Sequence, residues 1–154
     1  MGLEDLYREI ILDHYSRPRN RGRLEPADIV VEGANPLCGD ELALTVRVAD
    51  GRIREVRFEG RGCSISQASA SMMTEELRGK TLEEARALVA AFRAMMQGKP
   101  SALDATDLAA LQGVRKFPVR VKCATLAWVA IDQGIYEYQQ GRQTARATTE
   151  GPEG

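Results

Sequence analysis

Residues 41–60 place the strongest local constraint on the fold, because two alternating segments flank a tight turn. In ELALTVRV, apolar residues recur at every second position, which is the period of a strand with one buried face. These residues are Leu42, Leu44, Val46 and Val48. Asp50-Gly51 is a typical two-residue hairpin turn. The return segment, RIREVRFEG, places Val56 and Phe58 on one face, with Ile53 out of phase. The sequence therefore predicts a half-buried antiparallel hairpin.

The segments around this hairpin predict an α+β domain. DIVVEG is a candidate third strand. Helical spacing of apolar residues predicts helices before Pro18, from Cys63 to Gly79, from Thr81 onward, near residues 107–111, and after Pro118. We expect an antiparallel sheet of about three strands with helices packed on one face, in a single domain spanning residues 1–140. The tail, residues 141–154, has no apolar residue larger than alanine and is predicted to be disordered.

Composition excludes several classes of function. The 154 residues fit one domain, and their net charge of −1 gives no electrostatic footprint for nucleic acid or an anionic membrane. No apolar run is long enough to cross a bilayer, and the acidic, amphipathic start differs from a secretory signal. We expect a cytoplasmic protein, where three cysteines are free thiols or metal ligands rather than a disulfide framework.

Each of the three cysteines stands at the boundary of a predicted element. Cys38 lies in NPLCGD, before the first hairpin strand, and Cys63 follows the second. Antiparallel pairing brings those two ends together at one edge of the sheet. Cys123 joins them there if the last helix begins at the same edge. Three nearby thiolates suit zinc or iron, and Asp40 is a candidate fourth ligand.

Spacing alone does not separate this metal site from three ordinary buried thiols, since no CxxC pair is present. His14 is the only histidine and is far from every cysteine in sequence. We interpret it as a packed or docking residue, which makes a cysteine–histidine hydrolase improbable.

Several motifs resemble those of the U-type iron–sulfur assembly proteins, the IscU/NifU family. They are DHYSRPRNRG near the start and three cysteine-bearing segments: NPLCGD, FEGRGCSISQASASMM and VRVKCATLAWVAI. The resemblance covers about residues 3 to 138. It is closest to the SUF-type branch, SufU: Lys122 replaces the histidine that scaffold members place before the third cysteine, and KFPVRVK replaces their chaperone-binding segment. Extra residues around 97–113 also match that branch.

The resemblance implies a Zn²⁺ ion bound by Cys38, Asp40, Cys63 and Cys123. It further implies that Cys38 accepts persulfide sulfur from a PLP-dependent, SufS-like cysteine desulfurase, with other SUF assembly components as further candidate partners. The protein would then be a zinc-dependent sulfurtransferase. The alternative is a non-enzymatic scaffold that assembles a transient 2Fe–2S cluster on the same ligands. A structural zinc domain used only for docking is a third hypothesis.

Arg120 lies three residues before Cys123 and is a candidate positioning cation. We hypothesise that it pairs with Asp40 or stabilises the thiolate of Cys38. The alternative is an exposed, solvated arginine.

Overall fold

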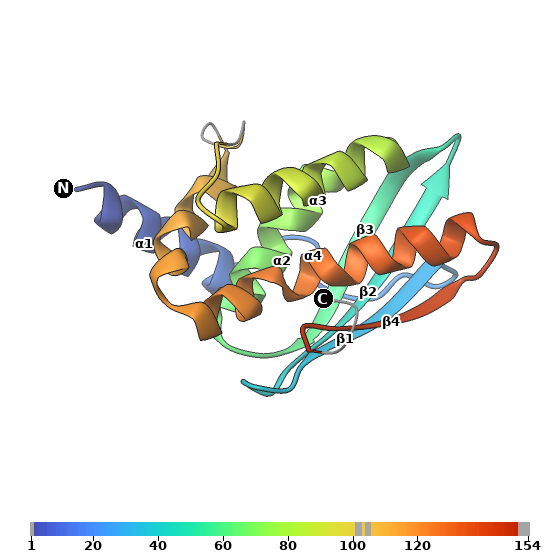
Figure 1. Ribbon diagram of the computed structural model, residues 1–154. Helices are drawn as coiled ribbons and strands as arrows, with labels where there is room; N and C mark the ends of the chain where they lie inside the picture. Colours follow the sequence, from blue (N-terminus) through green and yellow to red (C-terminus); the bar gives the residue numbers. More distant parts are fainter. Residues whose placement is uncertain (1, 101–102, 104–105, 151–154) are drawn as a thin grey trace.

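The computed structural model describes residues 2–100, 103 and 106–150. It contains two layers, a sheet and a group of helices that cover one of its faces (Figure 1). In chain order the elements are α1 (Leu3–Ser16), β1 (Ile29–Asn35), β2 (Asp40–Ala49), β3 (Arg52–Arg61), α2 (Ser64–Leu77), α3 (Leu82–Met96), the 3₁₀ helix η1 (Asp107–Lys116), α4 (Pro118–Gln139) and β4 (Thr144–Thr148).

The predicted hairpin is confirmed as β2 and β3. Leu42, Leu44 and Val46 are buried on the face that the helices cover. Ile53, out of phase in the sequence, is also buried, because a register shift pairs Arg47 with Glu55 but Val48 with Ile53. This β-bulge inserts one extra residue and returns Ile53 to the core face.

The sheet has four strands rather than about three, in the order β3-β2-β1-β4. β1 pairs antiparallel with β2, and β4 pairs parallel with β1. The prediction of a disordered tail is therefore wrong for residues 144–148. Only Ala145 and Ala147 of β4 pack against the core, so an edge strand held by backbone hydrogen bonds showed no apolar pattern. Positions 151–154 of the tail, and 101–102 and 104–105 of the predicted insertion, lie outside the described residues.

The helix boundaries follow their sequence signals. Thr81 and Glu84 form the predicted capping box at the start of α3. Pro118 occupies the first position of α4, where the backbone N–H has no partner within the helix and its absence costs nothing. The helix therefore begins at Pro118, five residues before Cys123. Trp128 of α4 stacks on Phe92 of α3 with ring centroids 4.3 Å apart, which joins the two helices in the core.

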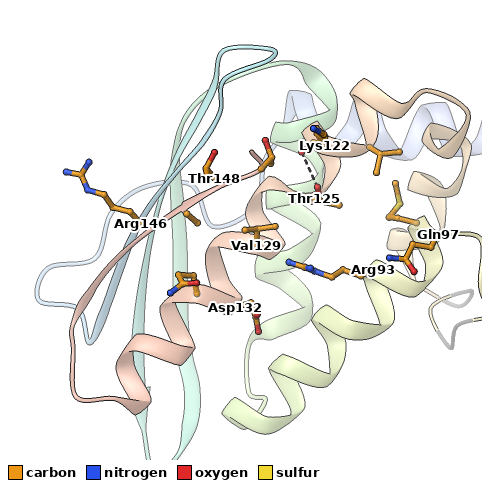
Figure 2. A pocket seen from close by; sticks show the side chains of 13 residues that line it. Arg93, Gln97, Lys122, Thr125, Val129, Asp132, Arg146 and Thr148 are labelled. Carbon is orange, nitrogen blue, oxygen red and sulfur yellow. Dashed lines mark hydrogen bonds between the residues drawn. The ribbon is translucent and has the colours of Figure 1, made fainter. Parts of the chain in front are cut away.

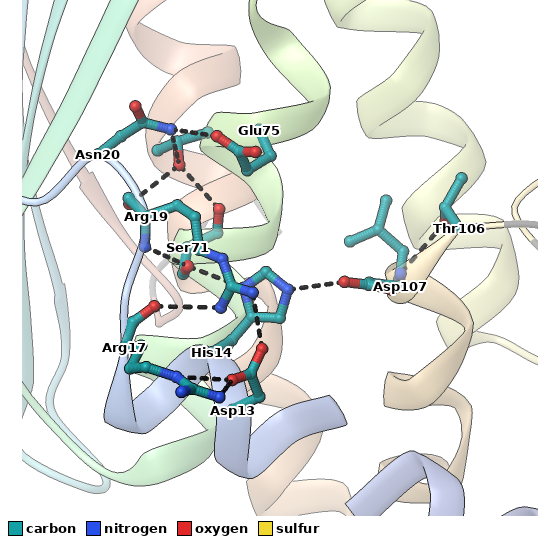
Figure 3. Close-up of polar contacts among 11 residues, drawn as sticks. Asp13, His14, Arg17, Arg19, Asn20, Ser71, Glu75, Thr106 and Asp107 are labelled. Atoms are coloured by element: carbon teal, nitrogen blue, oxygen red, sulfur yellow. Dashed lines mark hydrogen bonds and ion pairs between the residues drawn. The ribbon is translucent and has the colours of Figure 1, made fainter. Parts of the chain in front are cut away.

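His14 is packed, as expected, and fixes α1 to the helical layer (Figure 3). Its Nδ1 lies 2.8 Å from Ser71 Oγ in α2, and its Nε2 lies 2.8 Å from Asp107 Oδ2 at the start of η1. The only histidine is thus engaged by two partners on the helical side of the molecule.

The carboxylate of Asp13, the residue before His14, is expected to make a pH-dependent contribution to the stability of the fold. Hydrogen bonds from Arg19, and secondarily Arg17, lower the pKa of Asp13 from 3.8 to about 2. Because the folded pKa lies below the unfolded one, this contribution is present above about pH 4 and disappears as the pH falls toward 2. We expect Asp13→Asn to lower the Tm at pH 7 and the deficit to shrink between about pH 4 and pH 2. Thermal unfolding of both proteins across this range tests it; a deficit independent of pH would contradict it.

Candidate metal centre

The three cysteines come together at one end of the sheet, each from a different element. Cys38 lies in the loop between β1 and β2, Cys63 immediately precedes α2, and Cys123 lies in the second turn of α4. Their accessibility is graded: Cys38 is exposed, Cys63 is half-buried and Cys123 is buried. The hairpin and the start of α4 therefore produce the convergence expected from the sequence.

Cys38, Asp40 and Cys123 form a compact group of potential ligands. Their ligand atoms all lie within 4.8 Å of one another, and the sulfurs of Cys38 and Cys123 are 3.4 Å apart. Ligands about 2.0–2.3 Å from a tetrahedral zinc ion are separated by roughly 3.3–3.8 Å. The spacing and the donor types therefore fit a four-coordinate soft or borderline cation.

Cys63 adjoins this group without belonging to its tightest part. Its backbone N–H donates to Asp40 Oδ1 at 3.0 Å, which fixes the carboxylate against the start of α2. Among the described residues, the set whose ligand atoms all lie within 4.8 Å contains only the other three. Of the four predicted ligands, three are gathered and the fourth borders them.

Burial raises the pKa of the Cys123 thiol, and the adjacent Cys38, Asp40 and Cys63 act in the same direction. Each of these neighbours disfavours a further negative charge on Cys123. A bound divalent cation reverses this balance, since it supplies the positive charge that several clustered thiolates and a carboxylate require. The chemistry of the donor set thus favours a metal ion.

Two glycines shape the site. Gly39, between Cys38 and Asp40, has a φ of +73°, a conformation that side chains rarely adopt. Gly62 precedes Cys63, and a Cβ at this position would lie 2.6 Å from Asp40 Oδ1. Only glycine therefore allows the chain entering α2 to approach the carboxylate this closely.

Asn35 is a site residue that the sequence reasoning missed. It is the last residue of β1, pairs in register with Asp40 and is completely buried. Its Nδ2 donates to Asp40 Oδ2 at 3.1 Å and to Cys123 Sγ at 3.5 Å. One amide group thus contacts two candidate ligands. Its position as the first residue of NPLCGD was the available signal.

Arg120 does not pair with Asp40. It lies in the first turn of α4, is exposed, and forms no side-chain hydrogen bond or ion pair with the described residues. Asp40 accepts instead from Asn35 and Cys63. An interaction of Arg120 with the thiolate of Cys38 stays a prediction.

The side chain of Lys122 lines a groove of about 820 Å³ between α3, α4 and β4 (Figure 2). Its ammonium pairs with Glu150, which follows β4. Of the described residues lining the groove, none is a cysteine. Lys122, the neighbour of Cys123 in α4, is thus engaged by the segment that follows β4.

Comparison with known proteins identifies the family. Residues 6–145 match the NifU-like N-terminal domain. The chain belongs to this family. It is 48% identical over 141 residues to the zinc-dependent sulfurtransferase SufU of Bacillus subtilis strain 168, covering 90% of this chain and 95% of the relative. This confirms the predicted relationship to the SufU-type branch of the IscU/NifU-like family.

Other family members bear names that refer to scaffolds. An iron–sulfur cluster assembly scaffold protein IscU of Streptococcus pyogenes serotype M1 is 43% identical over 135 residues, covering 86% of this chain and 84% of the relative. The crystal structure of a putative scaffold protein for the SUF system of Fervidobacterium islandicum AW-1 superposes with a TM-score of 0.80 at 36% identity, covering 87% of this chain and 99% of the other. The family therefore confirms the α+β fold and a place in iron–sulfur cluster assembly.

The described helices include none that is both long and apolar enough to span a membrane.

Proposed function

We propose that the protein is a zinc-dependent sulfurtransferase that accepts persulfide sulfur on Cys38 from a PLP-dependent cysteine desulfurase. The observation that carries the proposal is the difference in exposure between two sulfurs only 3.4 Å apart. Cys38 is exposed in a loop, whereas Cys123 is buried in α4. One sulfur of the centre can therefore reach a partner while another stays anchored in the protein.

The zinc ion would be held by Cys38, Asp40, Cys63 and Cys123. Its positive charge would keep the three cysteine thiols deprotonated at neutral pH. Transfer requires the Cys38 thiolate to attack the outer sulfur of the desulfurase persulfide. A new S–S bond forms on Cys38, the donor S–S bond breaks, and the desulfurase cysteine leaves as a thiolate. Gly39, which adopts a left-handed conformation next to Cys38, has the backbone freedom that a movement of Cys38 toward the partner would require.

Similarity to the B. subtilis zinc-dependent sulfurtransferase supports this assignment over a scaffold. The residue before Cys123 supports it as well, because Lys122 pairs with Glu150 and offers no imidazole ligand beside Cys123. A transient 2Fe–2S scaffold is the second candidate, favoured by the three cysteines and one carboxylate and by the scaffold names of the S. pyogenes and F. islandicum relatives.

Anaerobic purification of the untagged protein, followed by metal and sulfide analysis, separates the two functions. A sulfurtransferase is expected to be colourless, to contain about one zinc ion per chain, and to accelerate alanine release from cysteine by the desulfurase. A brown protein that contains iron and acid-labile sulfide would support the scaffold instead. Zinc-loaded protein without any effect on the desulfurase would leave only a structural zinc domain.

A further inference from the structure

The C-terminal segment of residues 144–150, which we call the C-terminal strap, runs from the far end of α4 back to the metal centre. β4 lies parallel to β1, from Thr144 beside Val30 to Thr148 beside Ala34. The backbone N–H of Thr149 then donates to the carbonyl of Ala34 at 3.2 Å. The strap thus ends next to Asn35, the residue that contacts two candidate ligands.

Two contacts fasten this end of the strap. The hydroxyl of Thr149 donates to Asn35 Oδ1 at 2.9 Å. One residue later, the carboxylate of Glu150 pairs with Lys122, the neighbour of Cys123 in α4 (Figure 2 shows Lys122 and Thr148 across the groove). The strap therefore connects β1, whose Asn35 contacts Asp40, with α4, which carries Cys123.

The hydrogen-bonding capacity of the Asn35 side chain is engaged on both sides. Its two N–H groups face Asp40 and Cys123, and its carbonyl oxygen accepts from Thr149. Because Asn35 is completely buried, removing the Thr149 hydroxyl would leave that oxygen without a donor. The amide would then lose the contact that holds it against the two ligands.

We propose that Thr149 is a positioning residue for the metal centre, acting through Asn35, and that the C-terminal strap thereby sets the metal affinity. This inference rests on the proposed zinc site. Groups that orient metal ligands by hydrogen bonds commonly change affinity by 10- to 100-fold when they are removed. Thr149 contacts Asn35 and not a ligand itself, so we expect a loss of zinc affinity near the lower end of this range.

The test compares Thr149→Val with Thr149→Ser and Thr144→Val. Valine keeps the shape of threonine but lacks the hydroxyl, whereas serine restores it. Thr144→Val makes the same chemical change in the same strap, at an exposed position at the far end of β4 from the site. Zinc affinity is measured by competition with a chromophoric chelator, and Co²⁺ absorption spectra report ligand geometry.

We expect T149V to bind zinc roughly tenfold more weakly than the wild type and to alter the cobalt bands. T149S and T144V should match the wild type. A merely structural strap would lower the unfolding temperature of the metal-free protein in T149V and leave both the zinc affinity and the cobalt spectrum unchanged, which would overturn the inference. If T149V does not fold, T149A and T149S, which differ only in the hydroxyl, give the same comparison.

The outcomes also separate this inference from the proposed function. Tight zinc binding by the wild type with equal affinity in T149V would reject the role of Thr149 and leave the sulfurtransferase proposal intact. Wild-type protein that takes up no zinc would overturn both.

Discussion

Replacing Cys38 by serine is expected to reduce persulfide transfer at least 100-fold while the protein stays folded. A serine hydroxyl is hardly ionised at neutral pH and cannot form a persulfide, whereas a thiolate attacks readily. Cys38 is exposed in a loop, so the substitution leaves the core intact. The measurement is mass spectrometry of the alkylated protein after incubation with the desulfurase and cysteine, together with the rate of alanine formation.

A matched control for Cys38→Ser lies in the same loop. Leu37→Met keeps an exposed apolar side chain of similar volume beside Cys38 and should transfer sulfur normally. Zinc content and thermal unfolding of both variants show whether any lost activity reflects a lost metal ion or fold. A Cys38→Ser protein that still gains a persulfide, on Cys63 or Cys123, and still accelerates the desulfurase would reject Cys38 as the acceptor.

The convergence of the cysteines could be predicted because it follows from local patterns. Strict alternation and Asp50-Gly51 define the hairpin, and a hairpin brings Cys38 and Cys63 to the same end of the sheet whatever their separation in sequence. For Cys123 the sequence left a condition, that the last helix begins at the same end, and the structure meets it. The resemblance to the IscU/NifU family then indicated the metal.

Features held by long-range hydrogen bonds could not be predicted in this way. β4 buries only two alanines, and its backbone pairing with β1 leaves no trace in residue type. The contact between Thr149 and Asn35 joins residues 114 positions apart, and no local pattern links Thr149 to the NPLCGD motif that begins at Asn35. The β-bulge that returns Ile53 to the core likewise depends on strand register and not on composition.

Replacing Asp40 by alanine is expected to weaken zinc binding by roughly 100-fold or more. Structural zinc sites with four protein ligands bind with about 10–16 kcal/mol, so an average ligand contributes about 2.5–4 kcal/mol, equivalent to a factor of roughly 70 to 900. Asp40 also accepts from Asn35 and from the backbone of Cys63. Without it the buried amide of Asn35 and the half-buried N–H of Cys63 each lose a partner, which should destabilise the metal-free protein by about 1–3 kcal/mol.

Glu41 provides the matched control, because it is the next residue in β2 but is exposed and pairs with Arg61 at 3.2 Å. Glu41→Ala removes a carboxylate one position away, on the opposite face of the strand, and should change neither zinc affinity nor stability appreciably. Chelator competition and chemical denaturation of both variants measure the two effects separately. Equal zinc affinity in Asp40→Ala and Glu41→Ala would show that the carboxylate is not a ligand, and the centre would then depend on its thiols alone. A large loss confined to Asp40→Ala would establish the mixed sulfur and oxygen donor set that we propose for this centre.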